Sequence, residues 1–238
     1  MQLFTVGHSN HSVEKFLGLL KRNRVSAIAD VRSSPFSRRS PHFNQSSLRK
    51  SLASEGVSYV FLGEELGVRA KNPECYVEGK ARYELIAATE EFAVGLDRIL
   101  KGVKHHKIAL MCAEQDPITC HRAILVCKHL KDAGLDIQHI LKTSDLESHE
   151  HLEQRLLNLH GLSESLPLLK TSVTLNEPKA QLQLFDTGDF NTSSDKSNSV
   201  IKHSLPEDVI DQAYRLQSEQ IAYVEKYKNI NNSHKRAS

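Results

Sequence analysis

The chain has 238 residues, of which 39% are hydrophobic and 25% charged, and its formal net charge is +2. This balance is ordinary for one globular domain with appendages. No stretch approaches the 18 apolar residues of a membrane span, and the start lacks a signal-peptide pattern, so we expect a cytoplasmic protein without a membrane partner. Four cysteines are too few for a secreted disulfide framework, so we expect reduced thiols.

Basic residues are concentrated at the start of the chain. Residues 1–50 contain nine lysines and arginines but only two acidic residues, which gives this segment a net charge of +7 and the remainder −5. Such asymmetry suits a polyanionic partner, and we expect nucleic acid or a nucleotide. A basic face that only contacts solvent would produce the same pattern.

Short apolar runs and amphipathic stretches alternate through the first 62 residues. The pattern predicts strands over residues 3–6, 25–31 and 57–62, and helices that begin after Ser12 and Asn44. Gly56 stands where a helix usually ends. The stretch over residues 32–44, "RSSPFSRRSPHFN", is rich in turn-forming residues and is a predicted loop.

The alternation continues to about residue 160. The pattern predicts helices over residues 81–100, 120–131 and 146–159, and strands over residues 107–112 and 135–141. Because parallel neighbouring strands need helical crossovers, residues 1–160 are expected to form an α/β domain. Its sheet is expected to be open and mostly parallel, with about five strands flanked by helices.

The remaining residues differ in composition. Residues 161–205 are rich in Ser, Thr, Asn and Asp, and they are expected to form a flexible, disordered linker. Residues 206–238 are expected to form a C-terminal helix and tail. The helix places Val209, Ala213 and Leu216 near one apolar stripe, which would allow it to fold back onto the domain.

Unusual polar residues and a glycine fall at the carboxyl ends of the predicted strands. They are Gly7, His8 and Ser9 after the first strand, Asp30 and Arg32 around the end of the second, and Cys112 and Glu114 after the fourth. Ligands of open α/β sheets bind beyond these ends. We therefore expect the side chains to converge on one cleft.

The stretch "MCAEQDPITCHR", from Met111 to Arg122, carries the most chemistry in the chain. Thr119 is in position to cap a helix that starts at Cys120, which would place Cys120, His121 and Arg122 in a first turn that favours an anion. Arg122 adds a bidentate donor for phosphate or carboxylate.

Two residue types in this region suit catalysis. Glu114 is a candidate general acid or base, because partial burial would raise its pKa. Cys112 or Cys120 could supply a nucleophilic thiolate, although either cysteine could equally be a small packing residue. The thiolate-phosphatase loop does not fit, because Cys112 and Arg122 lie ten residues apart.

Zinc ligation is disfavoured by the spacing. Cys112, Cys120 and His121 would supply three ligands, but a gap of seven residues followed by two adjacent ligands is poor tetrahedral spacing. We therefore expect neither a metal nor another cofactor.

Five stretches in order resemble a known family: "TVGHSNHSVEKFLGLL", "ADVRSSPFSR", "YVFLGEELG", "LMCAEQDPITCHRAILV" and "IQHIL". They are similar to the successive motifs of the domain of unknown function 488 family and cover about residues 1–145. The resemblance implies an α/β domain with the strand-end residues in one pocket, and it implies no established reaction. Carried over residue by residue, it selects Gly7, His8, Ser9, Asp30, Arg32, Glu114, Cys120, His121 and Arg122.

Two functions are compatible with these residues. The first is an enzyme that hydrolyses a glycosidic or phosphoester bond of nucleic acid or a nucleotide, in which Glu114 or Asp30 moves a proton or activates water. Its candidate catalytic residues are Glu114, Asp30, Cys120 and His121, and its candidate binding residues are Gly7, His8, Ser9, Arg32 and Arg122. The alternative is a non-catalytic module that recognises a modified base, a DNA end or another phosphate-bearing ligand.

The stretch "QLQLF", from Gln181 to Phe185, lies in the predicted linker. Apolar residues are costly to expose there, so a short peptide ligand for a partner's groove is a natural explanation. The stretch resembles the motif by which bacterial replication and repair proteins bind the sliding clamp. The matching positions are Gln181, Leu182, Leu184 and Phe185. We expect a sliding clamp as partner and a role in DNA repair, unless the stretch simply packs onto the domain.

Overall fold

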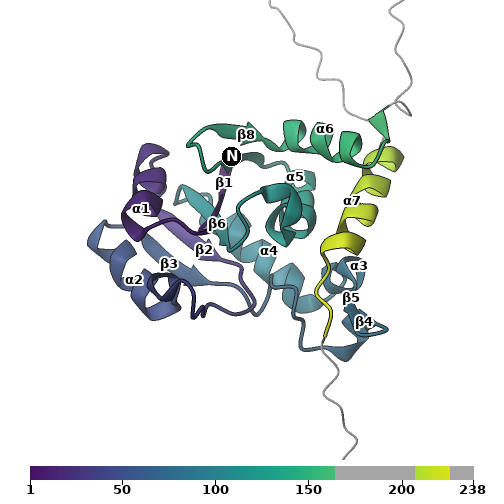
Figure 1. Cartoon of the computed structure of the whole chain (residues 1–238), viewed down its shortest axis with the longest axis horizontal. Helices are drawn as coiled ribbons and strands as arrows, with labels where there is room; N and C mark the ends of the chain where they lie inside the picture. The colour runs from purple at the N-terminus through teal and green to yellow at the C-terminus, as the bar shows by residue number, and fades with distance from the viewer. Residues whose placement is uncertain (164–206, 226–238) are drawn as a thin grey trace, which may run out of the picture.

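The computed structural model describes residues 1–163 and 207–225, whose strands and helices are shown in Figure 1. The strands are β1 (Gln2–Gly7), β2 (Ala27–Asp30), β3 (Ser58–Phe61), β4 (Tyr76–Val77), β5 (Lys80–Ala81), β6 (Ile108–Cys112), β7 (Asp136–Ile140) and β8 (Leu146–Ser148). The α-helices are α1 (Val13–Arg22), α2 (Gln45–Ser54), α3 (Tyr83–Ala87), α4 (Glu90–Gly102), α5 (Lys128–Asp132), α6 (His149–Leu159) and α7 (Glu207–Ile221). Short 3-10 turns form η1 (Pro41–Phe43), η2 (Pro73–Cys75) and η3 (Pro117–Thr119), and η4 (Arg122–Cys127) is π-helical.

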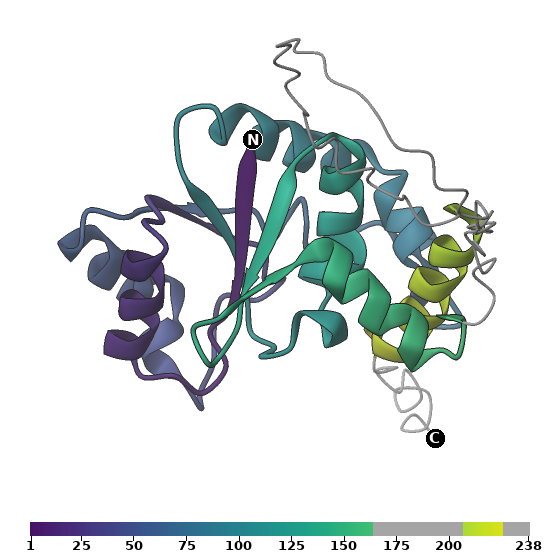
Figure 2. The same cartoon turned by 90° about the horizontal axis from the view of Figure 1, so that it is seen from above.

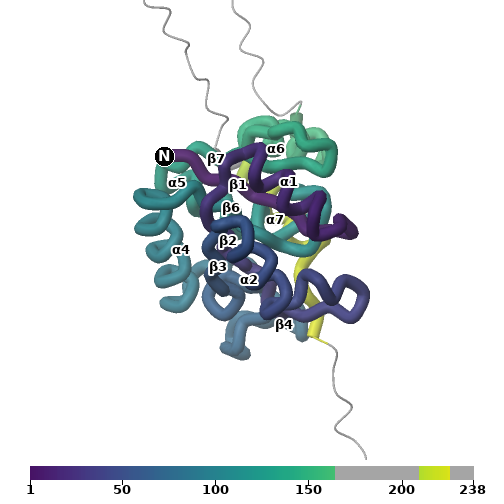
Figure 3. Tube along the Cα trace, turned by 90° about the vertical axis from the view of Figure 1, so that its left-hand side faces the viewer, coloured from purple at the N-terminus to yellow at the C-terminus, as the bar shows by residue number. Residues whose placement is uncertain are grey.

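The main sheet has the strand order β3-β2-β6-β1-β7-β8, and Figure 3 shows its first five strands in this sequence. These five strands are parallel, whereas β8 pairs with β7 in the antiparallel sense. The expected mostly parallel α/β sheet is confirmed. The predicted start of a helix at residue 146 is wrong, because Leu146–Ser148 forms this edge strand and α6 begins at His149.

Helices cover both faces of the main sheet, as Figure 2 shows from above. On one face α1 and α2 bury Phe16 and Leu48 against strand residues such as Ile28. On the other face the remaining helices pack around residues such as Leu110 and Leu156. Burying a side chain of this size stabilises the fold by about 1.5–3 kcal/mol, so the two cores hold the carboxyl edge of the sheet in place.

Most predicted element boundaries agree with the structure. The Ser12 side chain caps α1, and Gly56 ends α2 with a φ of 71°, a conformation that suits glycine. The helix expected over residues 81–100 is in fact two helices, α3 and α4. They are separated because the Thr89 side chain accepts a hydrogen bond from the backbone and starts a new helix.

Helix α7 packs against the domain, although it follows α6 only after a long intervening segment of the sequence. It buries Ile210, Ala213, Tyr214 and Gln217, four positions on one helical face. Leu216, which the sequence placed on this stripe, is 40% exposed. None of the described helices is long and apolar enough to cross a membrane. The "QLQLF" stretch lies outside the described residues.

Candidate functional site

Four side chains from one segment of the chain meet at the carboxyl end of β6. Each of Cys112, Glu114, Cys120 and His121 places a ligand atom within 4.8 Å of the others, and we call these four residues the thiol cluster. The Cys120 Sγ lies 3.0 Å from Glu114 Oε2, within hydrogen-bonding distance. Cys112 Sγ lies 3.7 Å from His121 Nδ1. Three members are buried, and Glu114 is exposed at the surface.

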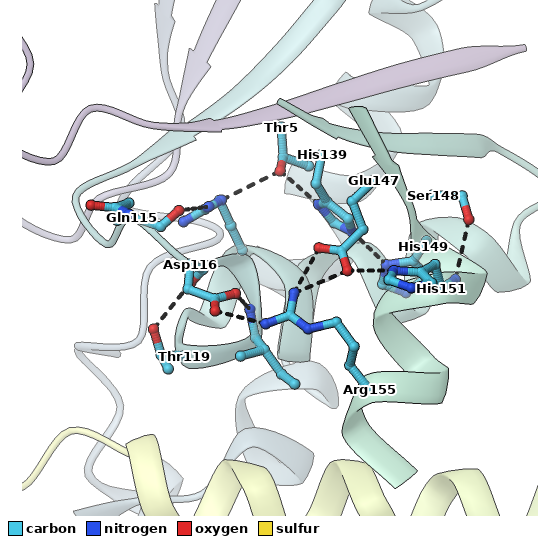
Figure 4. Close-up of polar contacts among 12 residues, drawn as sticks. Thr5, Gln115, Asp116, Thr119, His139, Glu147, Ser148, His149, His151 and Arg155 are labelled. Atoms are coloured by element: carbon cyan, nitrogen blue, oxygen red, sulfur yellow. Dashed lines mark hydrogen bonds and ion pairs between the residues drawn. The ribbon is translucent and has the colours of Figure 1, made fainter. Parts of the chain in front are cut away.

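A folded loop brings the two cysteines together across the seven residues between them. Asp116 starts η3 by accepting a hydrogen bond from the Ile118 backbone at 3.1 Å. Its other carboxylate oxygen accepts from Arg155 of α6 at 2.7 Å, and Glu147 binds the same guanidinium at 2.8 Å. Figure 4 shows Arg155 between the two carboxylates. The loop is therefore fixed from outside as well as by its own turn.

The sequence-based prediction that Thr119 caps a helix starting at Cys120 is wrong. The Thr119 hydroxyl donates to the Asp116 carbonyl at 3.0 Å, and Cys120 is extended, with a φ of −133°. The helical backbone bonds begin at the Cys120 carbonyl, which accepts from the amides of Ala123 and Ile124. Cys120 thus precedes the helix, and its side chain is directed into the thiol cluster.

Arg122 lies in a buried hydrogen-bond network, and its role as a phosphate donor stays a prediction. The residue is fully buried. Its guanidinium donates to the carbonyls of Glu114 and Gln115 at 2.8 and 3.2 Å, and to Thr5 Oγ1 at 3.3 Å. Because these bonds hold the loop that carries Glu114, Arg122 helps to position the thiol cluster.

Asp30 and Arg32 form a separate buried pair, and the catalytic role of Asp30 stays a prediction. The Arg32 Nε and Nη2 donate to the two Asp30 oxygens at 2.8 and 2.6 Å. Asp30 also accepts from the Arg32 amide at 3.2 Å and from the Tyr59 hydroxyl at 2.7 Å. With four donors around it, this carboxylate has no lone pair left for a substrate proton. Arg32 also donates to the carbonyl of Phe43 at 2.9 Å.

Gly7 and His8 likewise serve the architecture of the site. A Cβ on Gly7 would lie 1.9 Å from the Glu114 carbonyl oxygen, so only glycine lets the loop cross here. The His8 ring stacks on Phe43 with centroids 4.4 Å apart. Its Nε2 accepts from Arg32 at 3.3 Å, and its Nδ1 therefore donates to the Ser9 carbonyl at 3.0 Å. Burial, helped by the Arg32 charge, lowers the His8 pKa to about 4.

Ser9 is the predicted binding residue that lies closest to solvent. It is half-buried, and its hydroxyl makes long contacts of 3.3 Å to Asn10 and 3.5 Å to Gln115. The predicted binding residues therefore divide into a buried framework and one residue at the surface. Of the predicted catalytic residues, Glu114, Cys120 and His121 come together and Asp30 does not.

The ionisable groups of the thiol cluster shift one another. Burial acts to raise the pKa of Cys120, but the hydrogen bond from the Cys112 thiol, the Arg122 charge and His121 together lower it well below its usual range. Burial and the Cys120 thiolate raise the pKa of Cys112 and of Glu114. In this coupled group Cys120 therefore loses its proton most readily, while its neighbours hold their protons more tightly.

The orientation of His121 follows from its hydrogen bond to the backbone. Nε2 lies 3.0 Å from the Val31 carbonyl, which only accepts, so Nε2 carries a proton. In the neutral ring Nδ1 then has a lone pair directed at the cysteines. Burial lowers the pKa of His121, but the Cys120 thiolate and Glu114 outweigh this and raise it. These four side chains are the group of described residues able to hold a metal ion.

A buried hydrogen-bond chain, which the sequence does not reveal, connects Arg122 to α7. Glu153 accepts from the Tyr214 hydroxyl at 3.0 Å, which leaves the Tyr214 oxygen to accept from His149 Nε2 at 2.9 Å. His149 Nδ1 then accepts from His139 Nε2 at 3.0 Å. The chain ends where His139 Nδ1 accepts from Thr5 at 2.8 Å (Figure 4). Both histidines are neutral, because burial lowers their pKa values, that of His149 to about 3.

Fold and site together define an open parallel α/β domain with a thiol-rich cluster at the carboxyl edge of its sheet. The family model described as "Domain of unknown function DUF488" matches residues 12–128, so this part of the chain is similar to that family. No curated protein and no solved structure matches the chain. The matched residues include the whole thiol cluster, whereas Arg155 and Tyr214, which support it, lie beyond them.

Proposed function

We propose that the protein is an enzyme that acts on nucleic acid or a nucleotide and hydrolyses a glycosidic or phosphoester bond at the thiol cluster. The observation that carries the proposal is the environment of Glu114. This carboxyl is exposed to an incoming substrate, yet its pKa is raised and it bonds a buried thiol at 3.0 Å. A carboxyl poised in this way is suited to take up a proton from water and return it to a leaving group.

The distribution of positive charge supports a polyanionic substrate. The loop that begins after Val31, whose carbonyl binds His121, carries the exposed residues Arg38 and Arg39. Arg49 and Lys50 are exposed on α2. None of these four side chains makes an ion pair with another residue of the described ranges 1–163 and 207–225, so their charge is open to phosphates.

We further propose that a bacterial sliding clamp recruits the enzyme to DNA through the "QLQLF" stretch. Tethering raises the effective concentration of the catalytic domain on DNA, so weak intrinsic affinity for DNA suffices. This proposal rests on the sequence of residues 181–185. A labelled peptide of residues 176–190 should bind purified clamp at micromolar concentration and lose binding when Leu184 and Phe185 are both alanine. Absence of binding at hundreds of micromolar would contradict it.

The catalytic proposal is tested by a substrate screen with a matched pair of variants. Purified protein is offered free nucleotides and damaged or modified DNA, and products are measured. Glu114→Gln should abolish turnover and retain binding. Glu55→Gln is the control, because Glu55 lies beyond α2 at the opposite edge of the sheet in an exposed ion pair with Lys21. Unchanged turnover in Glu114→Gln contradicts the enzyme, and binding without turnover in the unmodified protein favours the recognition module.

A further inference from the structure

We propose that the thiol cluster is a binding site for a zinc-type divalent cation, with Cys112, Cys120 and His121 as ligands and Glu114 at the open side. Spacing along the chain disfavours such a site, because two ligands are adjacent and the third is eight positions earlier. The fold removes this objection. The loop from Cys112 to Cys120 turns back through η3, and the Arg155 bond to Asp116 holds it there.

The spacing of the ligand atoms fits a single cation. Zinc binds cysteine sulfur at about 2.3 Å and histidine nitrogen at about 2.0–2.1 Å, which gives tetrahedral edges of about 3.3–3.8 Å. Cys112 Sγ and His121 Nδ1 are 3.7 Å apart, and Cys120 Sγ and Glu114 Oε2 are 3.0 Å apart. All four atoms lie within 4.8 Å of one another. Side-chain adjustments of less than about 1 Å complete a tetrahedron.

The backbone contact of His121 is the one that metal-binding histidines use. A ligating histidine commonly donates its other ring N–H to a carbonyl or carboxylate, which fixes the tautomer and directs the free lone pair at the metal. The His121 Nε2 donates to the Val31 carbonyl at 3.0 Å, and Nδ1 faces the cysteines. The donor geometry therefore exists before any ion binds.

The charge balance of the cluster also favours a cation. Two thiols and a carboxyl, each able to carry a negative charge, have ligand atoms within 4.8 Å of one another. The nearest buried cation is Arg122, whose donors are directed at two carbonyls and Thr5. A divalent ion bound to the sulfurs would displace their protons and offset the combined charge.

The donor set selects the class of metal. Thiolate and imidazole ligands suit zinc and similar borderline-soft ions, whereas magnesium and calcium prefer oxygen ligands. Glu114 is the exposed member, so it is the ligand that water would replace. A site with three protein ligands and one exchangeable position is typical of catalytic rather than structural zinc.

The catalytic part of this inference rests on the proposed hydrolytic function. Water bound to the cation would pass a proton to the Glu114 carboxylate, and the resulting hydroxide oxygen would form the bond to phosphorus or to the sugar carbon. The bond to the leaving group breaks, the leaving group keeps its electron pair, and Glu114 returns the proton to it. Water is the only co-reactant consumed.

Metal content is measured on the full-length protein after equilibration with Zn²⁺ and removal of unbound ion. One equivalent per chain is expected. Cys120→Ser and His121→Gln should retain less than about a tenth of that amount, with folding checked by circular dichroism. Cys75→Ala is the matched control, because Cys75 is a buried cysteine in η2 outside the cluster. It should retain the full equivalent. Full zinc content in Cys120→Ser, or none in the unmodified protein, would overturn the proposal.

A second measurement needs no variant. Cobalt(II) should bind the unmodified protein with the near-ultraviolet absorption of cobalt–thiolate bonds, and it should protect two cysteines from alkylation. A Cys112–Cys120 disulfide without bound metal overturns the proposal. Zinc binding without turnover on any nucleic acid supports the metal site and contradicts the hydrolase. Turnover by zinc-free protein supports the hydrolase and contradicts the catalytic role of the cation.

Discussion

Glu114 is a single residue that lies between the buried thiol cluster and the protein surface. Its carboxylate bonds the buried Cys120 thiol, yet the residue itself is exposed. The backbone of the same residue packs over Gly7 and accepts from Arg122. Because both the side chain and the backbone of Glu114 are held, its carboxyl group has a defined position relative to a substrate. The side chain of an ordinary surface glutamate rotates freely and has no such position.

Replacement of Gly7 tests how closely the Glu114 loop depends on this crossing. In Gly7→Ala the new methyl group would lie 1.9 Å from the Glu114 carbonyl oxygen, so the loop must move. We expect a loss of about 1–3 kcal/mol in the free energy of unfolding, the range for over-packing, measured by chemical denaturation. Gly18→Ala is the control. Gly18 lies inside α1, and a Cβ added there would have no other atom within 4 Å. Alanine at this position should raise the free energy of unfolding by about 0.5–1 kcal/mol. Equal effects of the two substitutions would contradict the close approach.

Buried His8 should make stability depend on pH. Its pKa is about 4 in the folded protein, against an ordinary value of 6.5, so the unfolded chain binds the proton more strongly. The contribution is fully present above pH 6.5 and is lost as the pH falls through about 4. Between about pH 7 and pH 5, His8 should account for a loss of about 2 kcal/mol, at about 1.4 kcal/mol per pH unit. His8→Gln should lose correspondingly less over that interval in urea unfolding, and an identical loss would contradict the assignment.

At the scale of elements, the site depends on parts of the chain distant from it. The loop between β6 and η4 is held by Arg155 of α6 and by Gln217 of α7, whose side-chain amide donates to the Ile118 carbonyl at 2.8 Å. The Tyr214 hydroxyl completes the buried chain that leads to Arg122. Helix α7 is therefore part of the framework of the site, although the family model ends at residue 128.

Tyr214→Phe tests this role of α7. Removing the hydroxyl leaves His149 Nε2 without its buried acceptor and takes one donor from Glu153, which keeps its bonds from Lys131. We expect a loss of about 1–3 kcal/mol in the free energy of unfolding. Leu216→Ala, two positions along the same helix at a 40% exposed residue, should change it by less than about 0.5 kcal/mol. Thermal and chemical unfolding of both variants give the comparison. An unchanged free energy of unfolding in Tyr214→Phe would contradict the role of α7 in the framework of the site.

The sequence predicts the five parallel strands of the main sheet and most of its helices, but not the edge strand β8, the β4–β5 pair or the closure of the site. Local signals such as the apolar run of β6 and the Ser12 cap act over a few residues, so they were readable. The proximity of Cys112 and Cys120 depends on a turn whose anchor, Arg155, lies 39 residues after Asp116. No local pattern records such a contact, and spacing alone therefore argued against a metal.

The same limit applies to the surroundings of Arg122. An arginine after a predicted helix start resembles an anion donor, and the sequence contains no sign that the carbonyls of Glu114 and Gln115 turn back toward it. Asp30 and Arg32 were correctly placed at a strand end. Their mutual pairing, with Tyr59 from the neighbouring strand, became visible only in the assembled sheet.

At the scale of the whole molecule, charge and chemistry occupy adjoining regions. Arg49 and Lys50 are exposed on α2, and the loop that bears the exposed Arg38 and Arg39 begins after Val31, whose carbonyl accepts from His121 of the thiol cluster. An extended polyanion bound along these exposed residues would have phosphates near the loop. The electrostatic contribution to binding should therefore come from a defined set of residues rather than from the net charge of +2.

This distribution predicts salt-dependent binding to duplex DNA. Each phosphate that a basic side chain neutralises contributes about 0.9 to the slope of log affinity against log salt concentration. Replacing Arg38, Arg39, Arg49 and Lys50 by alanine should lower the slope by about that amount for each phosphate no longer neutralised, measured by fluorescence anisotropy. Replacing Lys101 and Lys104, near the end of α4 on the other face, should leave the slope unchanged. Equal slopes in all three proteins would mean that the basic segment is only a solvated surface.

The four members of the thiol cluster are expected to act as one site, in which the protonation of each residue depends on the others. This coupling is tested most directly by the pKa of Glu114, followed by carbon-13 NMR of the labelled carboxyl in chelator-treated protein, with and without Cys120→Ser. Serine keeps the size of the side chain but cannot supply the thiolate charge. We expect a Glu114 pKa above its usual range in the unmodified protein, caused by burial and the Cys120 thiolate, and a clearly lower value in the variant. The same Glu114 pKa in both proteins would contradict this expectation.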